Sequence, residues 1–229
     1  MKKKLVVFSG AGISAESGVQ TFRDSNGLWE NHRVEDVASP EGFERNSQMV
    51  LDFYNARRRQ LNEIEPNKAH LILAELENYF DVEIITQNVD DLYERAGSTK
   101  VTHLHGELKK ARPVNSESPI IPWENDLNVG DLNSEGIQLR PHIVWFGEMV
   151  PEMDKAMEIA SHADLFLVVG TSMSVYPAAG LIHYIPENCK VYLIDPNLEN
   201  TYSENQNHFK TTAVEGMKLF RTAILEKNH

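Results

Sequence analysis

The sequence predicts an α/β fold with a mostly parallel sheet and helices on both faces, because short apolar runs alternate with helical patterns. The helical patterns cover residues 67–79, after Pro66, and residues 152–162, after Pro151. The apolar runs are short and nearly continuous, as in buried parallel strands. These runs cover residues 5–8, 82–86, 165–169 and 191–194.

Two segments interrupt this alternation and are predicted to form a smaller lobe. The first holds several helical pieces, one of which Ser39 and Pro40 can start as N-cap and first helical residue. The second is polar and turn-rich, with one apolar island, PIIPW. The run HIVWF at residues 142–146 is predicted to be a strand that enters the sheet domain. We therefore expect a sheet domain of residues 1–22, 67–106 and 142–229 and a small lobe of residues 23–66 and 107–141.

Charge and cysteine content exclude several classes of protein. The chain of 229 residues has a formal net charge of −12, which argues against a nucleic-acid binder. The single cysteine, Cys189, rules out an intramolecular disulfide and a cysteine-rich zinc site. The apolar run after MKKK is too short for a secretion signal, and no later run approaches the ~18 residues of a membrane span. We expect a cytoplasmic protein that does not bind membranes, and the oligomeric state stays open.

Small and polar residues follow each of the four predicted strands. The segments are SGAGISAESG, TQNVDD, GTSMS and DPN, in chain order. The carboxyl ends of parallel strands meet at one edge of a sheet, and ligands bind at that edge in open α/β folds. The sequence therefore predicts a binding site assembled from these four segments.

The first segment fits the G-x-G-x-x-G/A pattern of a dinucleotide phosphate loop, with Gly10, Gly12 and Ala15 at the key positions. Glycines allow a tight turn and close approach of the backbone to a pyrophosphate, although a purely structural glycine turn is an equal alternative. The acidic residue expected about 20 positions later, at the end of a second strand, is missing. A conventional hydride-transferring dehydrogenase is therefore disfavoured.

Two other segments leave alternatives open. The run from Thr86 to Asp90 either binds sugar hydroxyls and an amide or caps a helix over residues 91–95. His103 and His105 share one side of a strand and are candidates for a metal pair, a catalytic histidine or core histidines. Since no third metal ligand stands nearby, a lone general base is the better functional interpretation.

Five motifs together give the chain a family resemblance. GAGISAESGVQTFRD, TQNVDDLYERAGS, HLHGEL, VWFGE and GTSMSVYPAAG occur in this order and span nearly the whole sequence. The chain thus resembles the sirtuins, which are NAD-dependent protein-lysine deacylases. The resemblance implies a Rossmann-like NAD domain, a small lobe built from two insertions, and acyl-lysine proteins or peptides as substrates.

The resemblance also implies roles for particular residues. His105 is the expected catalytic base, and Asn88 and Asp90 are expected to act beside it at the ribose and nicotinamide. An extended substrate peptide is expected between two strands, with contacts from Val144, Phe146, Gly147, Glu148 and Val175. The expected NAD-binding residues are Gly10, Ala11, Gly12, Glu16, Phe22, Arg23, Gln87, Asn88, Asp90, Gly170, Thr171, Ser172, Asp195 and Ala213.

The chemistry implied by the resemblance is acyl transfer rather than hydride transfer. The acyl oxygen of the substrate lysine attacks C1′ of the nicotinamide ribose as nicotinamide leaves. His105 then helps a ribose hydroxyl to attack the resulting imidate. The implied products are deacylated lysine, nicotinamide and O-acyl-ADP-ribose, and this chemistry needs one well-placed base.

Two departures from the family pattern stand out. Sirtuins commonly carry two Cys-x-x-Cys pairs for a structural zinc between the HG and VWFGE motifs, and this chain has no cysteine there. We therefore expect no such zinc site and a lobe held by apolar contacts from Ile120, Ile121 and Trp123. Asp195 stands where the family often has asparagine, which predicts an altered ribose contact with NAD binding retained.

The stretch FYNARRRQL places three arginines in this acidic chain. Helical winding puts Arg57 on an apolar stripe with Tyr54, leaves Arg58 at its edge and turns Arg59 to the opposite side. A buried guanidinium needs an anion or a hydrogen-bond network, and an internal carboxylate is one candidate. Tyr54 and Arg57 also match the Tyr-x-x-Arg pair of sirtuins that remove acidic acyl groups. This match predicts removal of succinyl and malonyl groups, with some deacetylation, because arginine can bind their carboxylate through a paired fork.

Other functions compete with this prediction. A sensor of NAD or ADP-ribose without turnover is one alternative, although the intact QNVD, HG and VWFGE elements argue against it. An ADP-ribosyltransferase or an NAD hydrolase would use the same site and differ in products. The sequence identifies neither the physiological protein substrates nor the order of acyl preference.

Overall fold

The computed structural model describes residues 2–20, 28–29, 32–197 and 206–226. Its main element is a six-stranded parallel sheet in the order β11-β10-β9-β1-β4-β5. Each of the four predicted strands is present in this sheet, and their neighbours pair in parallel register, as in Val7 opposite Ile84 and Leu167. The strands are β1 (Lys4–Ser9), β4 (Asp81–Thr86), β5 (Val101–His103), β9 (Leu165–Val169), β10 (Lys190–Ile194) and β11 (Gln206–Phe209).

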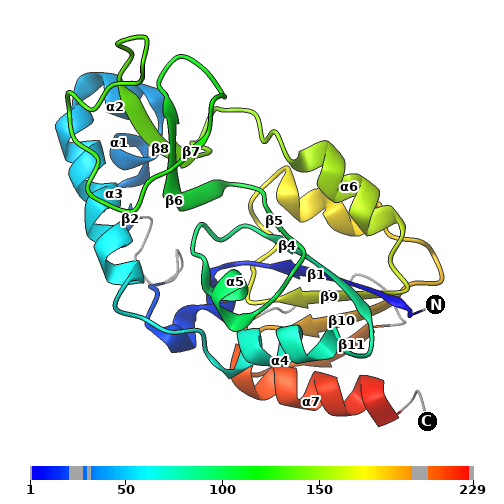
Figure 1. The fold of residues 1–229 in the computed structure, drawn as a ribbon. Coiled ribbons are helices and arrows are strands. Elements are labelled where there is room, and N and C mark those ends of the chain that lie inside the picture. The colour runs from blue at the N-terminus through cyan, green and yellow to red at the C-terminus, as the bar shows by residue number, and fades with distance from the viewer. Residues whose placement is uncertain (1, 21–27, 30–31, 198–205, 227–229) are drawn as a thin grey trace.

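Helices cover both faces of this sheet (Figure 1). Helices α4 (Lys68–Leu76) and α7 (Ala213–Glu226) pack on the face that carries Leu5 and Val7. Helix α6 (Met153–Ser161) and the 3-10 helix Ala178–His183 pack on the opposite face, which carries Val6 and Phe8. Successive strand residues point to opposite faces, so β1 contributes to both cores and is fully buried at these positions. This is the predicted α/β architecture.

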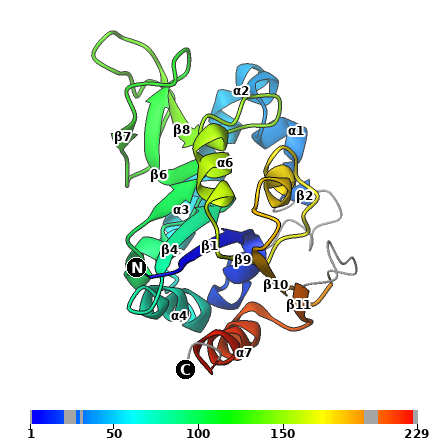
Figure 2. The same cartoon turned by 90° about the vertical axis from the view of Figure 1, so that its right-hand side faces the viewer.

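A second, smaller sheet lies beside the first (Figures 1 and 2). Strands β7, β6 and β8 form it in antiparallel pairs, and helix α3 packs against it through a buried cluster. That cluster consists of Leu51, Ala111, Leu127 and Leu139. The elements of this region are α1 (Val34–Val37), α2 (Pro40–Arg45), α3 (Ser47–Leu61), β6 (Gly106–Pro113), β7 (Ile121–Pro122) and β8 (Leu139–Ile143). Three further short elements are β2 (Leu28–Trp29), β3 (His32–Arg33) and α5 (Leu92–Ala96).

Local signals explain several element boundaries. The Ser39 Oγ accepts the Gly42 N–H at 2.9 Å and Pro40 opens α2, as predicted. Asn67 caps α4 through the Ala69 N–H at 2.8 Å. None of the described helices is long and apolar enough to cross a bilayer.

The structure corrects two predictions about the small lobe. The strand predicted at residues 142–146 is β8, which ends at Ile143 and belongs to the small sheet. It stops there because the N–H groups that follow bond outside the small sheet. The Phe146 N–H, for example, donates to the Ala38 carbonyl at 2.9 Å. Ile121 and Trp123 pack on the lobe's apolar cluster as expected, but Ile120 is 46% exposed and contributes nothing to it.

Candidate functional site

The carboxyl ends of β1 and β9 meet through their glycine loops. The Gly10 N–H donates to the Val169 carbonyl at 3.2 Å and the Gly12 N–H to the Gly170 carbonyl at 2.9 Å. A Cβ on Gly12 would lie 2.7 Å from the Gly170 Cα, and Gly170 itself has φ +62°. These glycines are therefore required for the two loops to pack together, with Ala11 in the short 3-10 turn between them.

A buried polar network joins the first loop to the segment after β4. The Asn88 Nδ2 donates to the Ser14 Oγ at 3.1 Å, and the Ser14 hydroxyl donates to the Asp90 Oδ2 at 3.0 Å. The His70 Nδ1 accepts the Asn67 N–H at 3.3 Å, so its Nε2 carries the proton and faces Ser14 at 3.4 Å. Burial lowers the pKa of His70 to about 4, which keeps it neutral. Every polar group in this network thus has a defined donor or acceptor role.

Asp90 has an unusual environment for a carboxylic acid. It is 5% exposed, and burial raises its pKa to about 6 despite hydrogen bonds from Ser14 and from the Leu92 N–H. The bond to Leu92 also supports the start of α5. Both interpretations of this segment, polar ligand binding and helix capping, are therefore compatible with its geometry. The sequence reasoning missed Ser14 and His70, although Ser14 stands inside the glycine motif.

Other predicted NAD-binding residues follow β4, β9 and β10, whose carboxyl ends lie at the same edge of the parallel sheet as that of β1. The Gln87 Nε2 donates to the buried Thr171 Oγ1 at 3.0 Å, which ties the ends of β4 and β9 together. Ser172 follows Thr171 directly. Asp195 is buried after β10 and accepts the Asn197 N–H at 2.8 Å.

Glu16 serves the start of the last helix. Its carboxylate accepts the Val214 N–H at 2.8 Å and the Thr212 hydroxyl at 3.2 Å, beside the buried Ala213. A carboxylate is favourable at this position because the helix N-terminus carries partial positive charge. Its contacts within the chain are therefore structural. Phe22 and Arg23 lie outside the described residues.

His105 is oriented by the polypeptide backbone. Its Nδ1 lies 3.1 Å from the Gln87 carbonyl, which can only accept, so Nδ1 carries the proton and Nε2 is the unprotonated nitrogen of the neutral ring. Burial lowers the pKa of His105 below its ordinary value, despite the bond to Gln87. The side chain is thus prepared as a neutral base at Nε2.

His103 does not act as the second half of a metal pair. Its Nδ1 lies 2.8 Å from the Asn88 carbonyl and its Nε2 lies 2.9 Å from a Glu94 carboxylate oxygen. In the part of the chain that the structure describes, no group of three or more His, Cys, Asp or Glu side chains could hold a metal ion. Of the alternatives left open by the sequence, the geometry favours a lone base at His105 and a structural histidine at His103.

Helix α3 separates the three arginines by environment. Arg57 is 6% exposed and its guanidinium lies 5.1 Å from the centre of the Phe53 ring. Arg58 is 1% exposed and donates to the Leu108 carbonyl at 2.9 Å and the Asn55 Oδ1 at 2.8 Å. Arg59 is on the surface and pairs with Asp126. Arg58 is therefore a core residue of the small lobe, and Arg59 is at the surface as predicted.

Tyr54 is completely buried near Arg57 and Arg140. Its hydroxyl accepts the Trp145 Nε1–H at 2.9 Å. Burial raises the pKa of Tyr54 above its ordinary value, so the phenol stays protonated and retains a hydrogen to donate.

The VWFGE segment is held in place by ionic and backbone contacts. The Glu148 carboxylate binds the Arg140 guanidinium at 2.6 and 3.1 Å and accepts the Trp145 N–H at 2.7 Å. The Val144 N–H donates to the His105 carbonyl at 2.9 Å. The carboxylate of Glu148, predicted to contact substrate, is thus engaged inside the protein.

The outer part of the predicted peptide site is more open. Phe146 is 52% exposed, and Gly147 next to it adopts φ +91° with open space around its Cα. Val175, on the other predicted side of the peptide, accepts the Ala179 N–H through its carbonyl at 2.9 Å. These three residues line exposed segments, in contrast to the buried pair Tyr54 and Trp145.

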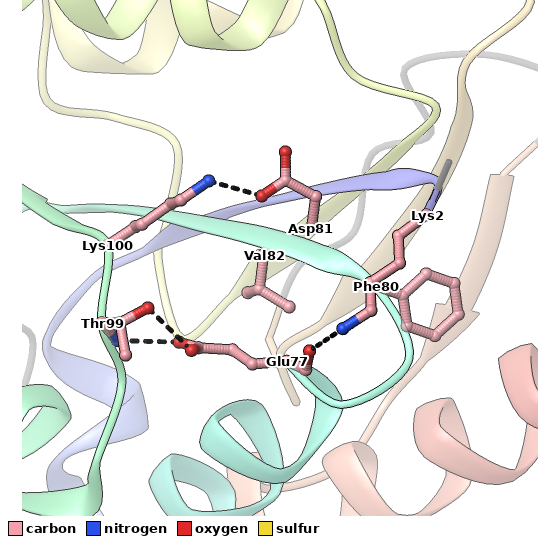
Figure 3. A pocket seen from close by; sticks show the side chains of 7 residues that line it. All are labelled: Lys2, Glu77, Phe80, Asp81, Val82, Thr99 and Lys100. Carbon is pink, nitrogen blue, oxygen red and sulfur yellow. Dashed lines mark hydrogen bonds and ion pairs between the residues drawn. The ribbon is translucent and has the colours of Figure 1, made fainter.

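A separate pocket of about 490 Å³ lies at the opposite edge of the sheet, near the amino ends of β1 and β4 (Figure 3). Its charged side chains bind within the pocket: Lys100 donates to the Asp81 carboxylate at 2.5 Å, Lys2 to the Glu77 backbone carbonyl at 2.7 Å, and the Glu77 carboxylate accepts from Thr99 at 2.8 Å. None of the predicted site residues lines it. This pocket is therefore separate from the predicted site at the carboxyl edge.

Comparison with known proteins agrees with this geometry. The Sir2 family profile matches residues 10–177. An "NAD-dependent protein deacylase" of Helicobacter pylori is 51% identical over 98% of both chains, and one of Bacteroides thetaiotaomicron is 50% identical over 97% of this chain and 98% of its own. A solved Sir2 homologue in complex with ADP-ribose superposes with a TM-score of 0.88 at 37% identity, covering 99% of this chain and 93% of its own. A Sir2 homologue–NAD complex superposes with a TM-score of 0.86 at 37% identity, covering 99% and 91%. The chain therefore belongs to the Sir2 family.

Proposed function

We propose that this NAD-dependent protein-lysine deacylase removes acidic acyl groups, succinyl and malonyl, from lysine side chains, and acetyl groups to a lesser degree. The observation that carries the proposal is the burial of Arg57 together with Tyr54 on one face of α3. A buried guanidinium is costly unless an anion or a hydrogen-bond network meets it, and a neutral acyl group supplies no anion. A succinyl or malonyl tail ends in the carboxylate that arginine binds best.

The three arginines of α3 have different neighbours. Arg58 is fixed to the Leu108 carbonyl and Asn55, and Arg59 pairs with Asp126 at the surface. The Arg57 guanidinium lies over the Phe53 ring, and its positive charge acts on the Tyr54 hydroxyl. Of the three, Arg57 is thus the arginine beside the phenol that the proposal also uses.

The Tyr54 hydroxyl is prepared to donate to the same carboxylate. Because its oxygen accepts from the Trp145 Nε1–H, the hydroxyl hydrogen is directed away from the indole. Burial keeps the phenol protonated at neutral pH. In the proposed complex, the acyl carboxylate is bound by the Arg57 guanidinium and by a hydrogen bond from the Tyr54 phenol.

The carboxyl edge of the sheet fits NAD by the chemistry of its donors. Gln87, Asn88, Thr171, Ser172 and Asp195 supply amide, hydroxyl and carboxylate groups for ribose hydroxyls and the nicotinamide amide. When bound, NAD supplies an electrophilic C1′ with nicotinamide as the leaving group. His105 accepts a proton from a ribose hydroxyl at Nε2, while its Nδ1–H stays on the Gln87 carbonyl. Water is the remaining reactant: its oxygen adds to the acyl carbon as the C–N bond to lysine breaks, so nicotinamide, O-acyl-ADP-ribose and free lysine are the proposed products.

Replacing Arg57 by Met tests the acyl preference directly. We expect kcat/KM for a succinyl-lysine peptide to fall, because a desolvated charge pair is lost. The fall should correspond to a loss of about 2–5 kcal/mol in transition-state stabilisation. Activity on the matching acetyl-lysine peptide should persist. Arg59→Met is the matched control, since it removes the same charge from the exposed side of α3. An unchanged succinyl/acetyl ratio in Arg57→Met would refute the role of Arg57.

A further inference from the structure

His103 has an arrangement that neither the family resemblance nor the proposed mechanism uses. It is the last residue of β5 and is 9% exposed. Its Nδ1 lies 2.8 Å from the Asn88 carbonyl, and its Nε2 lies 2.9 Å from Glu94 Oε1 on helix α5. The ring thus bridges the segment after β4 to the helix that follows it.

Both partners of His103 are hydrogen-bond acceptors. A backbone carbonyl has no hydrogen to give, and an ionised carboxylate has none either. Neutral imidazole carries one N–H and can satisfy only one of them, whereas imidazolium carries two N–H groups and satisfies both. The two distances therefore specify a protonated ring.

The electrostatic surroundings of His103 agree with this charge state. Burial lowers its pKa, but the hydrogen bond to Glu94 and the negative charge of that residue outweigh burial and raise the pKa above its ordinary value. Conversely, the Glu94 pKa is net lowered, because the bond to His103 and its charge outweigh burial. Asp90 and Glu107 also face the ring with negative charge, whereas Lys110 lies near Glu94 and bonds Glu107.

We propose that His103 is a cationic positioning residue that holds the Asn88 backbone in the geometry needed to bind NAD, with Glu94 as its counter-ion. The inference rests on the proposed role of residues 87–90 in NAD binding. His103 and His105 hold two consecutive carbonyls, those of Asn88 and Gln87. With both peptide planes fixed, the Asn88 side chain reaches Ser14 and the Gln87 side chain reaches Thr171.

Loss of the second proton has a definite structural consequence. If the neutral ring keeps its Nδ1–H, the Nε2 lone pair faces the Glu94 carboxylate and the two repel. If it keeps its Nε2–H, the Asn88 carbonyl loses its donor. Each neutral state therefore loosens the segment, so the KM for NAD should rise several-fold as pH increases through the pKa of His103.

Glu94→Gln removes the negative charge of the His103–Glu94 pair but keeps a side chain of nearly the same size. Glutamine can donate its amide hydrogen to Nε2, which satisfies a neutral ring that keeps Nδ1–H on Asn88. The variant should therefore bind NAD like the wild type but lose the rise in KM at high pH. Glu94→Ala removes the partner altogether and should raise the KM for NAD with little change in kcat. Glu107→Gln is the matched control, because it removes a nearby negative charge without breaking a hydrogen bond to His103.

Nitrogen-15 NMR of the histidine rings reads the proton directly. We expect both ring nitrogens of His103 to be protonated at pH 7 in the wild type and in Glu107→Gln, and Nδ1 alone in Glu94→Gln. A single protonated nitrogen in the wild type at pH 7 would overturn the inference. So would a doubly protonated ring combined with an unchanged KM for NAD in Glu94→Ala. Asn88→Ala tests the proposed NAD-binding role separately: unchanged NAD binding there would refute the role of the loop, whatever the charge of His103.

Discussion

The carboxyl edge of the large sheet and the small lobe are held together by different kinds of polar contact. At the carboxyl edge of the large sheet, hydroxyl and amide side chains from separate loops bind one another, as in Ser14 with Asn88 and Gln87 with Thr171. In the small lobe, buried guanidinium groups are matched by carbonyls and carboxylates, as in Arg58 with Leu108 and Arg140 with Glu148. The first arrangement agrees with binding of a polar cofactor, and the second agrees with the proposed binding of a charged acyl group.

The contrast also suggests how the lobe holds together without the zinc cysteines common in sirtuins. The Arg140 guanidinium binds Glu148 through both nitrogens, donates to the Ile143 carbonyl at 2.8 Å and lies 3.1 Å from the centre of the Trp145 ring. Trp145 in turn bonds Tyr54. Strand β8 is thereby connected to the proposed acyl pocket by a continuous set of contacts.

The largest expected effect is a loss of turnover from a substitution beside the carboxyl edge of the large sheet. His105→Tyr should abolish turnover, because no neutral base remains at that position, while the fold survives. Product formation by mass spectrometry measures the first and thermal melting the second. Full activity in a folded variant would contradict the assigned base.

In the small lobe we expect a loss of stability from Glu148→Ala. Removing one member of a buried ion pair leaves Arg140 uncompensated and should cost about 3–5 kcal/mol of unfolding free energy. Asp126→Ala, which breaks the exposed pair with Arg59, is the control and should cost less than about 1 kcal/mol. Urea unfolding measures both, and equal costs would show that the Arg140–Glu148 contact does not brace the lobe.

A smaller effect is expected from pH. The neutral form of His105 is the base, and burial lowers its pKa below its ordinary value of 6.5. Protonation therefore begins at lower pH than for an exposed histidine. In single turnovers at saturating NAD, the rate should stay constant above pH 7 and fall only below pH 6.5. A decline that starts above pH 7 on acidification would contradict the neutral, buried base.

No effect is expected from metal removal. Chelator treatment of tag-free protein should leave the melting temperature and the deacylation rate unchanged, because residues 107–141 contain no cysteine. Elemental analysis should find no stoichiometric zinc. Stoichiometric zinc lost together with stability would show that a site of other ligands holds the lobe.

The sheet and its ligand edge were predictable because their signals are local. Each buried strand is a short apolar run, and each is followed directly by the small or polar residues that form the edge. Strands β6 and β11 and helix α7 were not predicted, and the strand expected to carry both His103 and His105 is β5, which ends at His103. Strand β8 was misplaced because the Phe146 N–H bonds to the Ala38 carbonyl, which is distant in the sequence, and the Trp145 N–H bonds to the Glu148 side chain.

The site shows the same division between local and distant signals. Helical winding identified Arg57 and Tyr54 as buried and Arg59 as exposed, since all lie on one helix. It left Arg58 open, because the Leu108 carbonyl that binds it comes from another part of the chain. Similarly, the partner of the His70 ring, Ser14, lies 56 positions away, and sequence spacing gives no sign of it.

The central claim is that one site combines NAD chemistry with recognition of an acidic acyl group. The most direct measurement incubates the wild-type protein with NAD and matched succinyl-lysine and acetyl-lysine peptides and resolves all products by mass. We expect deacylated peptide, nicotinamide and O-succinyl-ADP-ribose in equal amounts, with a higher kcat/KM for the succinyl peptide. ADP-ribosylated peptide, NAD consumption without deacylation, or a higher kcat/KM for the acetyl peptide would contradict this account.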